Sequence, residues 1–108
     1  MQSFIEKHIL LEEMYEDHYY PKFLVDKLKI IMLETIEYLL SGKHDKDEVQ
    51  EKLDEMTIKI NNLQEDFYEN DSEIETVARE CIATDVQYIL DYFSLDIDVE
   101  EALRERDW

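Results

Sequence analysis

Residues that build turns and cross-links are scarce in this 108-residue chain, which contains one glycine, one proline and one cysteine. Tight β-hairpins depend on turn residues, so the shortage argues against a β-sheet protein and favours long helices. A single cysteine, Cys81, excludes a disulfide within the chain. Together with the lack of a basic, apolar leader, it predicts a reducing, cytoplasmic setting.

Basic residues are also few, with 11 Lys and Arg against 29 Asp and Glu and a net charge of -18. A negative surface repels phosphate backbones and anionic lipids, so we expect neither nucleic acid nor a membrane as a partner. A basic protein is the partner that the charge favours. Apolar runs such as Ile30 to Leu33 are far shorter than the roughly 20 residues of a membrane span.

Hydrophobic residues nevertheless make up 44% of the chain, as in a folded domain. A chain of this length buries roughly 65% of its unfolded surface without disulfides or a structural metal. We therefore predict a single domain over residues 1–108.

Helix starts are marked by an acceptor side chain three residues before a carboxylate, the spacing of a capping box. The four pairs are Ser3 with Glu6, Asp45 with Glu48, Ser72 with Glu75, and Asp98 with Glu101. Pro21 suits a fifth start, and Gly42 a helix end. These signals predict helices over residues 4–17, 21–40, 46–68, 73–93 and 99–106. Short loops between them favour an all-α, antiparallel up-down bundle of four main helices plus a short C-terminal helix.

Two of the predicted helices differ in their apolar pattern. The helix over residues 46–68 carries one narrow apolar seam, which predicts packing on one side of a core. This seam consists of Val49, Leu53, Met56, Ile60, Leu63 and Phe67. The helix over residues 21–40 is apolar around much of its circumference, which predicts a central position.

Negative charge is concentrated toward the C-terminus, where residues 71–108 contain twelve acidic and three basic residues. This acidic run favours either a surface for cationic side chains or a solvated face that keeps the protein soluble. Its last members are Asp96, Asp98, Glu100, Glu101, Glu105 and Asp107.

Patterns that would carry chemistry are incomplete. Residues 96–100 alternate carboxylates like a calcium loop but lack its glycine. His8 and Glu12 are spaced to hold two metal positions, yet no second pair completes a site. Cys81 falls on an apolar helix face, where burial raises a thiol pKa and makes it a core residue. We assign no catalytic residue, no cofactor and no metal.

Aromatic residues gather at one predicted helix junction, where Tyr15, Tyr19, Tyr20 and Phe23 surround acidic residues. Tyrosine is frequent both in cores and at binding surfaces, and two interpretations remain. The tyrosines either pack the bundle end with their hydroxyls on helix termini, or they form a partner site. Trp108 is similarly either a core cover or a binding residue. For Arg79 we expect an ion pair with Glu75, one turn earlier.

Three segments, MYEDHYYPKFLVDK, NDSEIETVAREC and RERDW, resemble a family of small acidic bacterial proteins known only as a domain of unknown function. The resemblance spans nearly the whole chain, except the acidic stretch of residues 45–69, and it implies no reaction, cofactor or substrate. It implies that a set of residues forms one connected structural or functional feature. The set comprises Tyr15, Glu16, Asp17, Tyr20, Pro21, Glu75, Arg79, Glu80, Arg106, Asp107 and Trp108.

Three hypotheses for function follow. The first is a small acidic interaction module that binds or neutralises a basic protein, as immunity proteins or regulators do. The second is a small enzyme or ligand-binding bundle with a site at the tyrosine-rich end. The third is a homodimeric structural protein, so the sequence leaves monomer and homodimer open.

Overall fold

The computed structural model describes residues 8–108, and this part of the chain contains helices and no strand. The all-α prediction is therefore confirmed. In chain order the helices are α2 (Glu12–Glu16), α3 (Lys22–Leu40), α4 (Lys46–Glu69), α5 (Thr76–Tyr92) and α6 (Val99–Ala102).

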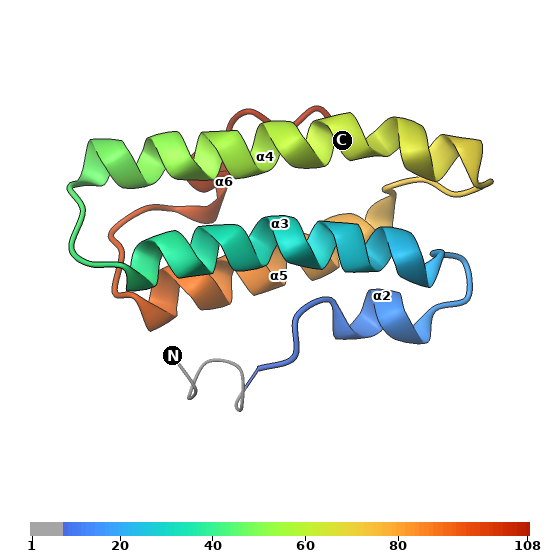
Figure 1. Ribbon diagram of the computed structural model, residues 1–108, viewed down its shortest axis with the longest axis horizontal. Coiled ribbons are helices and arrows are strands. Elements are labelled where there is room, and N and C mark those ends of the chain that lie inside the picture. The colour runs from blue at the N-terminus through green and yellow to red at the C-terminus, as the bar shows by residue number, and fades with distance from the viewer. Residues whose placement is uncertain (1–7) are drawn as a thin grey trace.

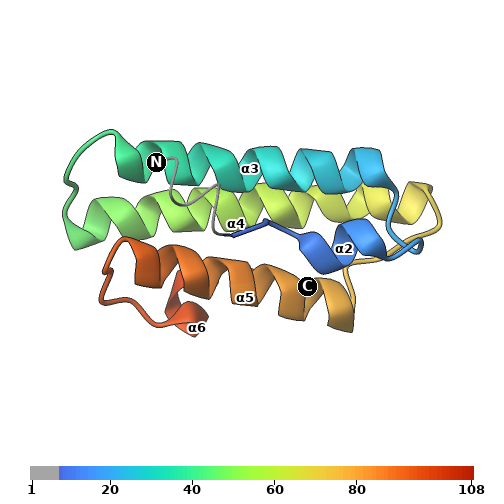
Figure 2. The ribbon, with the colours of Figure 1, turned by 90° about the horizontal axis from the view of Figure 1, so that it is seen from below.

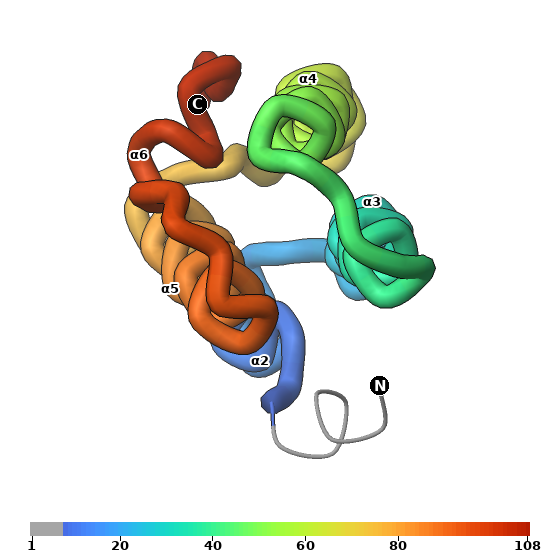
Figure 3. Tube along the Cα trace, turned by 90° about the vertical axis from the view of Figure 1, so that its left-hand side faces the viewer, coloured from blue at the N-terminus to red at the C-terminus, as the bar shows by residue number. Residues whose placement is uncertain are grey.

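The three long helices lie side by side, with α3 and α4 running in opposite directions and α5 returning in the direction of α3 (Figure 1). Viewed along the long axis, they occupy the corners of a triangle (Figure 3). The short α2 packs against α5 and α3, and α6 packs against α5 and α4. The α2–α3 turn and the α4–α5 connection meet at one end of the molecule (Figure 2). The α3–α4 and α5–α6 connections meet at the other.

The helix predicted over residues 4–17 differs from the structure, and its first four residues and the Ser3–Glu6 pair lie outside the described part. Residues 8–11 are not helical, and α2 spans only five residues. The backbone is left-handed at Leu11, with φ of 59°, and the Leu11 N–H donates to the buried Asp85 side chain. This tertiary hydrogen bond takes the place of a helical one, so residues 8–108 contain three long helices rather than the four main helices predicted.

The other start signals have mixed outcomes. Asp45 and Glu48 form the predicted capping box at α4. Asp98 caps α6 through the Glu100 N–H, but that helix ends at Ala102, earlier than predicted. The box predicted for Ser72 and Glu75 is wrong, because the Ser72 backbone N–H bonds to the α4 end and α5 starts only at Thr76. Pro21 precedes the first helical residue of α3 instead of occupying it.

The apolar seam of α4 is buried along its whole length, as predicted. It joins a single core cluster with the inner faces of α2, α3, α5 and α6. The prediction of a central α3 is wrong, because Phe23 and Ile30 on this helix are 52% and 57% exposed. Within residues 8–108, no helix is both long enough and apolar enough to cross a membrane.

Candidate functional site

Exposed apolar side chains are concentrated at the end of the bundle where α2 and α4 end and α3 and α5 begin. Of seven large hydrophobic residues exposed within residues 8–108, four belong to this end: Tyr19, Phe23, Tyr68 and Val77. Tyr68 is the most exposed of these four, at 61%. Carboxylates of α2, its turn and the start of α5 lie near Tyr19 and Val77. At Phe23 the neighbour is a cation, because the Lys27 ammonium lies 6.0 Å from the centre of its ring. We call this surface the acidic aromatic end; it comprises Glu13, Glu16, Asp17, Tyr19, Phe23, Tyr68, Glu73, Glu75 and Val77.

Tyr20 holds this end together from inside. Its side chain is 2% exposed and packs edge-to-face on Phe67, with ring centroids 6.4 Å apart. Its hydroxyl oxygen accepts a hydrogen bond of 3.2 Å from the Ala78 backbone N–H. Glu75 is the N-cap residue of α5, but its side chain accepts no hydrogen bond from the helix. The Tyr20 hydroxyl therefore satisfies a free N–H of the first turn, as an N-cap side chain would. Burial raises the pKa of Tyr20.

Tyr19 lies next to this anchor but faces the surface. The Asp17 carboxylate accepts a 2.9 Å hydrogen bond from the Tyr19 N–H, which fixes the α2–α3 turn. Desolvation and the charges of Glu75 and Glu73 raise the pKa of the Tyr19 hydroxyl. An aromatic ring with two carboxylates around it is suited to a lysine or arginine, which can contact the ring face and a carboxylate together.

A shallow, open hollow of about 490 Å³ adjoins the turn, lined by Glu13, Glu16, Asp17, His18 and Val77. Its shape matches a docking surface for a protruding side chain more closely than an enclosed ligand pocket. Met14 and Tyr20 fill the bundle interior nearby.

Other members of the predicted set point elsewhere. The Tyr15 hydroxyl donates to Asp26 at 2.5 Å, and burial together with this acceptor raises the pKa of Tyr15 to about 12. Tyr15 thus fastens α2 to α3. Arg79 and Glu80 are exposed on α5. The ion pair expected between Arg79 and Glu75 is not formed, and Arg79 has no other ion pair within residues 8–108.

The C-terminal residues form a second, separate group on the polar face of α4. Asn61 bonds to the backbone of Glu105 and Asp107, at 2.8 and 3.2 Å, and the Gln64 amide donates to the Asp107 carboxylate. The Arg106 guanidinium lies 5.6 Å from the Trp108 ring. Trp108 is half-buried against the core, which agrees with its interpretation as a core cover.

Carboxylates of the acidic C-terminal run form ion pairs with arginines of the same segment. One of these arginines, Arg104, also binds Asp54 of α4 with two hydrogen bonds of 3.1 and 2.7 Å. Desolvation opposes ionisation of Asp54, but the bonds from Arg104 and Gln50 outweigh it and lower the pKa of this carboxyl. Glu101 pairs with Arg104, and Glu100 with Arg106. Because these carboxylates are paired, the acidic aromatic end has more unpaired carboxylates than the C-terminal run.

A polar cluster that the sequence analysis missed is centred on Asp85, which is 4% exposed on α5. One carboxylate oxygen lies 2.6 Å from His8 Nε2, and the other accepts a 2.7 Å bond from the Leu11 N–H. The His8 ring stacks on Tyr88 with centroids 4.0 Å apart. Desolvation raises the Asp85 pKa. The signal was present, because Asp85 follows Cys81 by one turn on the apolar face of the helix.

His8 therefore contacts Asp85 rather than serving with Glu12 as a metal pair. Within residues 8–108, no group of three or more His, Cys, Asp and Glu residues is placed to hold a metal ion. Cys81 is a core residue as predicted, and burial followed by the Asp85 charge raises its thiol pKa to about 11.

Taken with the fold, these surfaces define a small, strongly acidic, all-helical protein whose exposed aromatic residues concentrate at one end. The chain belongs to a family of unknown function, DUF5713, whose model matches residues 4–108. The resemblance to a domain of unknown function is thereby confirmed. The chain matches none of the curated proteins and none of the solved structures.

Proposed function

We propose that this protein is an interaction module that binds a basic protein partner through the acidic aromatic end. The observation that carries the proposal is the concentration of exposed aromatic and apolar side chains among unpaired carboxylates at that end. Aromatic residues are enriched in binding hot spots, and a charged rim directs the approach of an oppositely charged partner.

The hydrogen bonds that hold this surface also support the proposal. Hydrogen bonds from the Ala78 N–H to the Tyr20 hydroxyl and from the Tyr19 N–H to the Asp17 carboxylate hold this end in one conformation, which reduces the conformational entropy that a partner's docking would cost. Lysine or arginine side chains of the partner would contact Tyr19 or Tyr68 together with Glu73 or Glu75. Neutralising a basic partner, as an immunity protein or a regulator does, is the role that this chemistry fits.

Two other functions receive less support. A ligand-binding or enzymatic site at the tyrosine-rich end requires a deep pocket with converging carboxylates, whereas the hollow there is open and Tyr20 fills the interior. A homodimer through this end would bring two acidic surfaces together, at an electrostatic cost. Light scattering at two protein concentrations tests the homodimer directly.

The experiment is a pull-down from native cell extract with tagged protein, stepped salt elution and mass spectrometry. The end variant combines Tyr68→Ser, Glu16→Gln and Glu73→Gln. The control variant combines Ile58→Ser, Glu37→Gln and Glu51→Gln, which removes one exposed apolar side chain and two charges elsewhere.

We expect wild type and the control variant to retain one basic protein that elutes at moderate salt, where the Debye length is about 8 Å. The end variant should lose it. Equal retention by both variants would reject this surface, and binding that salt does not weaken would reject the electrostatic basis of the proposal.

A further inference from the structure

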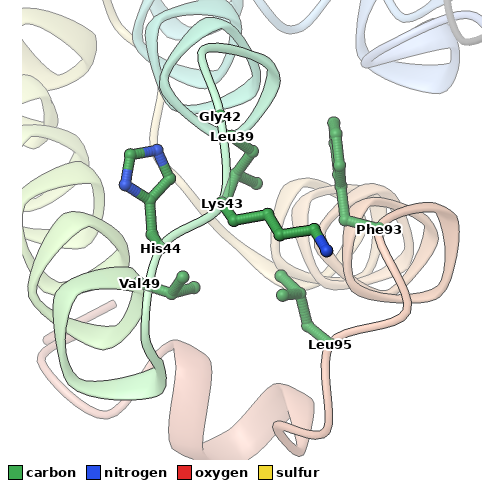
Figure 4. A pocket seen from close by; sticks show the side chains of 7 residues that line it. All are labelled: Leu39, Gly42, Lys43, His44, Val49, Phe93 and Leu95. Carbon is green, nitrogen blue, oxygen red and sulfur yellow. The ribbon is translucent and has the colours of Figure 1, made fainter.

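A second hollow lies at the opposite end of the molecule, where the α3–α4 and α5–α6 connections meet (Figure 4). It has a volume of about 340 Å³, within the lower range of small-molecule sites. Its lining residues are Leu39, Gly42, Lys43, His44, Val49, Phe93 and Leu95.

The chemistry of this hollow differs from the rest of the surface. Leu39, Val49, Phe93 and Leu95 give it apolar walls, and no carboxylate lines it. In a chain with 29 acidic residues, a hollow lined by one lysine, one histidine and no carboxylate differs in charge from the rest of the surface. The backbone that shapes it is specific, because Gly42 has φ of 154°, a conformation that other residues rarely adopt.

The two basic side chains play different parts. His44 is already engaged: its Nε2 lies 3.0 Å from the Tyr38 carbonyl oxygen and 3.3 Å from Ser41 Oγ, and its ring stacks on Tyr38. Lys43 forms no ion pair within residues 8–108 and extends across the opening toward Phe93 and Leu95 (Figure 4). Its ammonium group is therefore available to an anion held in the hollow.

We propose that this hollow binds a small organic acid, whose aromatic or branched apolar body packs on Leu39, Phe93 and Leu95 while its carboxylate meets the Lys43 ammonium. Charge complementarity selects this occupant, because an apolar neutral molecule would leave Lys43 unused and a cation would be repelled by it. A ligand of about ten non-hydrogen atoms is expected to bind with a Kd on the order of 1 mM.

Salt dependence distinguishes this site from the partner surface. The net charge of -18 repels an approaching anion over long distances, and salt screens that repulsion more than it weakens the direct Lys43 contact. Affinity for the acid should thus stay level or rise between about 0.01 M and 0.1 M salt, as the Debye length falls from about 30 Å to about 10 Å. Binding of a basic protein should weaken over the same range.

The test is a titration of the ¹⁵N-labelled protein with phenylacetate and, separately, with its neutral analogue phenylacetamide, followed by amide shifts in two-dimensional NMR spectra. We expect phenylacetate to shift the signals of Gly42, Lys43 and Leu95, and phenylacetamide to bind at least tenfold more weakly. Equal binding of both compounds would overturn the proposal. So would shifts confined to other parts of the protein, or no shift at about 10 mM phenylacetate.

Two variants complete the test. Lys43→Gln removes an exposed charge and should weaken phenylacetate binding at least tenfold with the fold unchanged in the same spectra. Lys46→Gln removes a nearby exposed charge that does not line the hollow and should leave binding unchanged. Unchanged binding in Lys43→Gln, or an equal loss in both variants, would reject a specific carboxylate contact.

Discussion

The buried carboxylate of Asp85 allows a sharp test of how the N-terminal segment is held on α5. The Asp85 side chain accepts a hydrogen bond from the buried Leu11 N–H and contacts His8 Nε2. Replacing Asp85 with Ala removes both acceptors, whereas Asn preserves the shape and keeps one acceptor oxygen for Leu11. The two variants therefore separate the value of the hydrogen bonds from the cost of the buried charge.

The magnitude follows from burial. Leu11 is fully buried, and an unsatisfied buried N–H costs about 1–3 kcal/mol. Asp85→Ala should thus lower the free energy of unfolding at pH 7 by about 1–3 kcal/mol. Asp85→Asn should stay within about 1 kcal/mol of wild type, because it satisfies Leu11 without a buried charge.

The pH dependence has a definite sign. Desolvation raises the Asp85 pKa above its ordinary value of 3.8, against the lowering effects of His8 and Leu11, and the Glu13 charge raises it further. A carboxyl with a raised pKa in the folded state is easier to ionise after unfolding. Asp85 therefore costs stability above its folded pKa, and this cost disappears as the pH falls to the ordinary value. The stability of Asp85→Asn relative to wild type should accordingly increase with pH from about 4 upward and then level off.

Urea denaturation followed by circular dichroism between pH 4 and pH 8 measures these differences. Asp96→Asn serves as a control, because it removes one exposed carboxylate and so reports the effect of net charge alone. The reasoning is refuted if Asp85→Asn is as unstable as Asp85→Ala at pH 7. It is also refuted if the difference between Asp85→Asn and wild type follows the pH dependence of the control.

Three further predictions concern the core. Tyr20→Phe should lower the free energy of unfolding by about 1 kcal/mol, because the Ala78 N–H loses its acceptor, and an unchanged urea midpoint would exclude the proposed capping role. The Cys81 thiol, with a pKa of about 11, should react with a thiol reagent at pH 8 far more slowly in the folded protein than in urea; equal rates would contradict its burial. Leu53→Asp should unfold the protein, since it buries a charge at a cost of several kcal/mol; a helical circular dichroism spectrum with wild-type stability would refute the packing of the α4 seam.

Local sequence signals predicted the elements that depend on local interactions. The seam of α4, from Val49 to Phe67, repeats at helical spacing, and burial of every member follows from that repeat. The capping box at Asp45 also forms within four consecutive residues. The shortage of glycine and proline excluded a sheet for the same kind of reason.

Interactions between residues far apart in the sequence account for most of the differences between the predicted and the observed helix starts. Leu11 leaves the helical conformation because its N–H bonds to Asp85, 74 positions away. The Ser72 signal fails because the Ser72 N–H bonds to the Phe67 carbonyl at the end of α4, while at the start of α5 the Tyr20 hydroxyl, 58 positions from Ala78, accepts the hydrogen bond of the Ala78 N–H. Sequence spacing carries little information about tertiary partners, so the candidate cap at Ser72 was wrong, and so was the helical assignment of residues 8–11.

The candidate site shows the same division. Composition alone determined that the protein is acidic and predicted that it is helical, since charge and turn content need no knowledge of the fold. The basic partner is a proposal that rests on this charge. Only the tertiary structure decided which carboxylates remain unpaired. Carboxylates of the C-terminal run contact Arg104, Arg106 and α4, whereas Glu73 and Glu75 near Tyr19 form no ion pair within residues 8–108. The tertiary structure also placed Lys43 across an apolar hollow formed by two connections that are about 50 residues apart, a proximity that arises from helix packing.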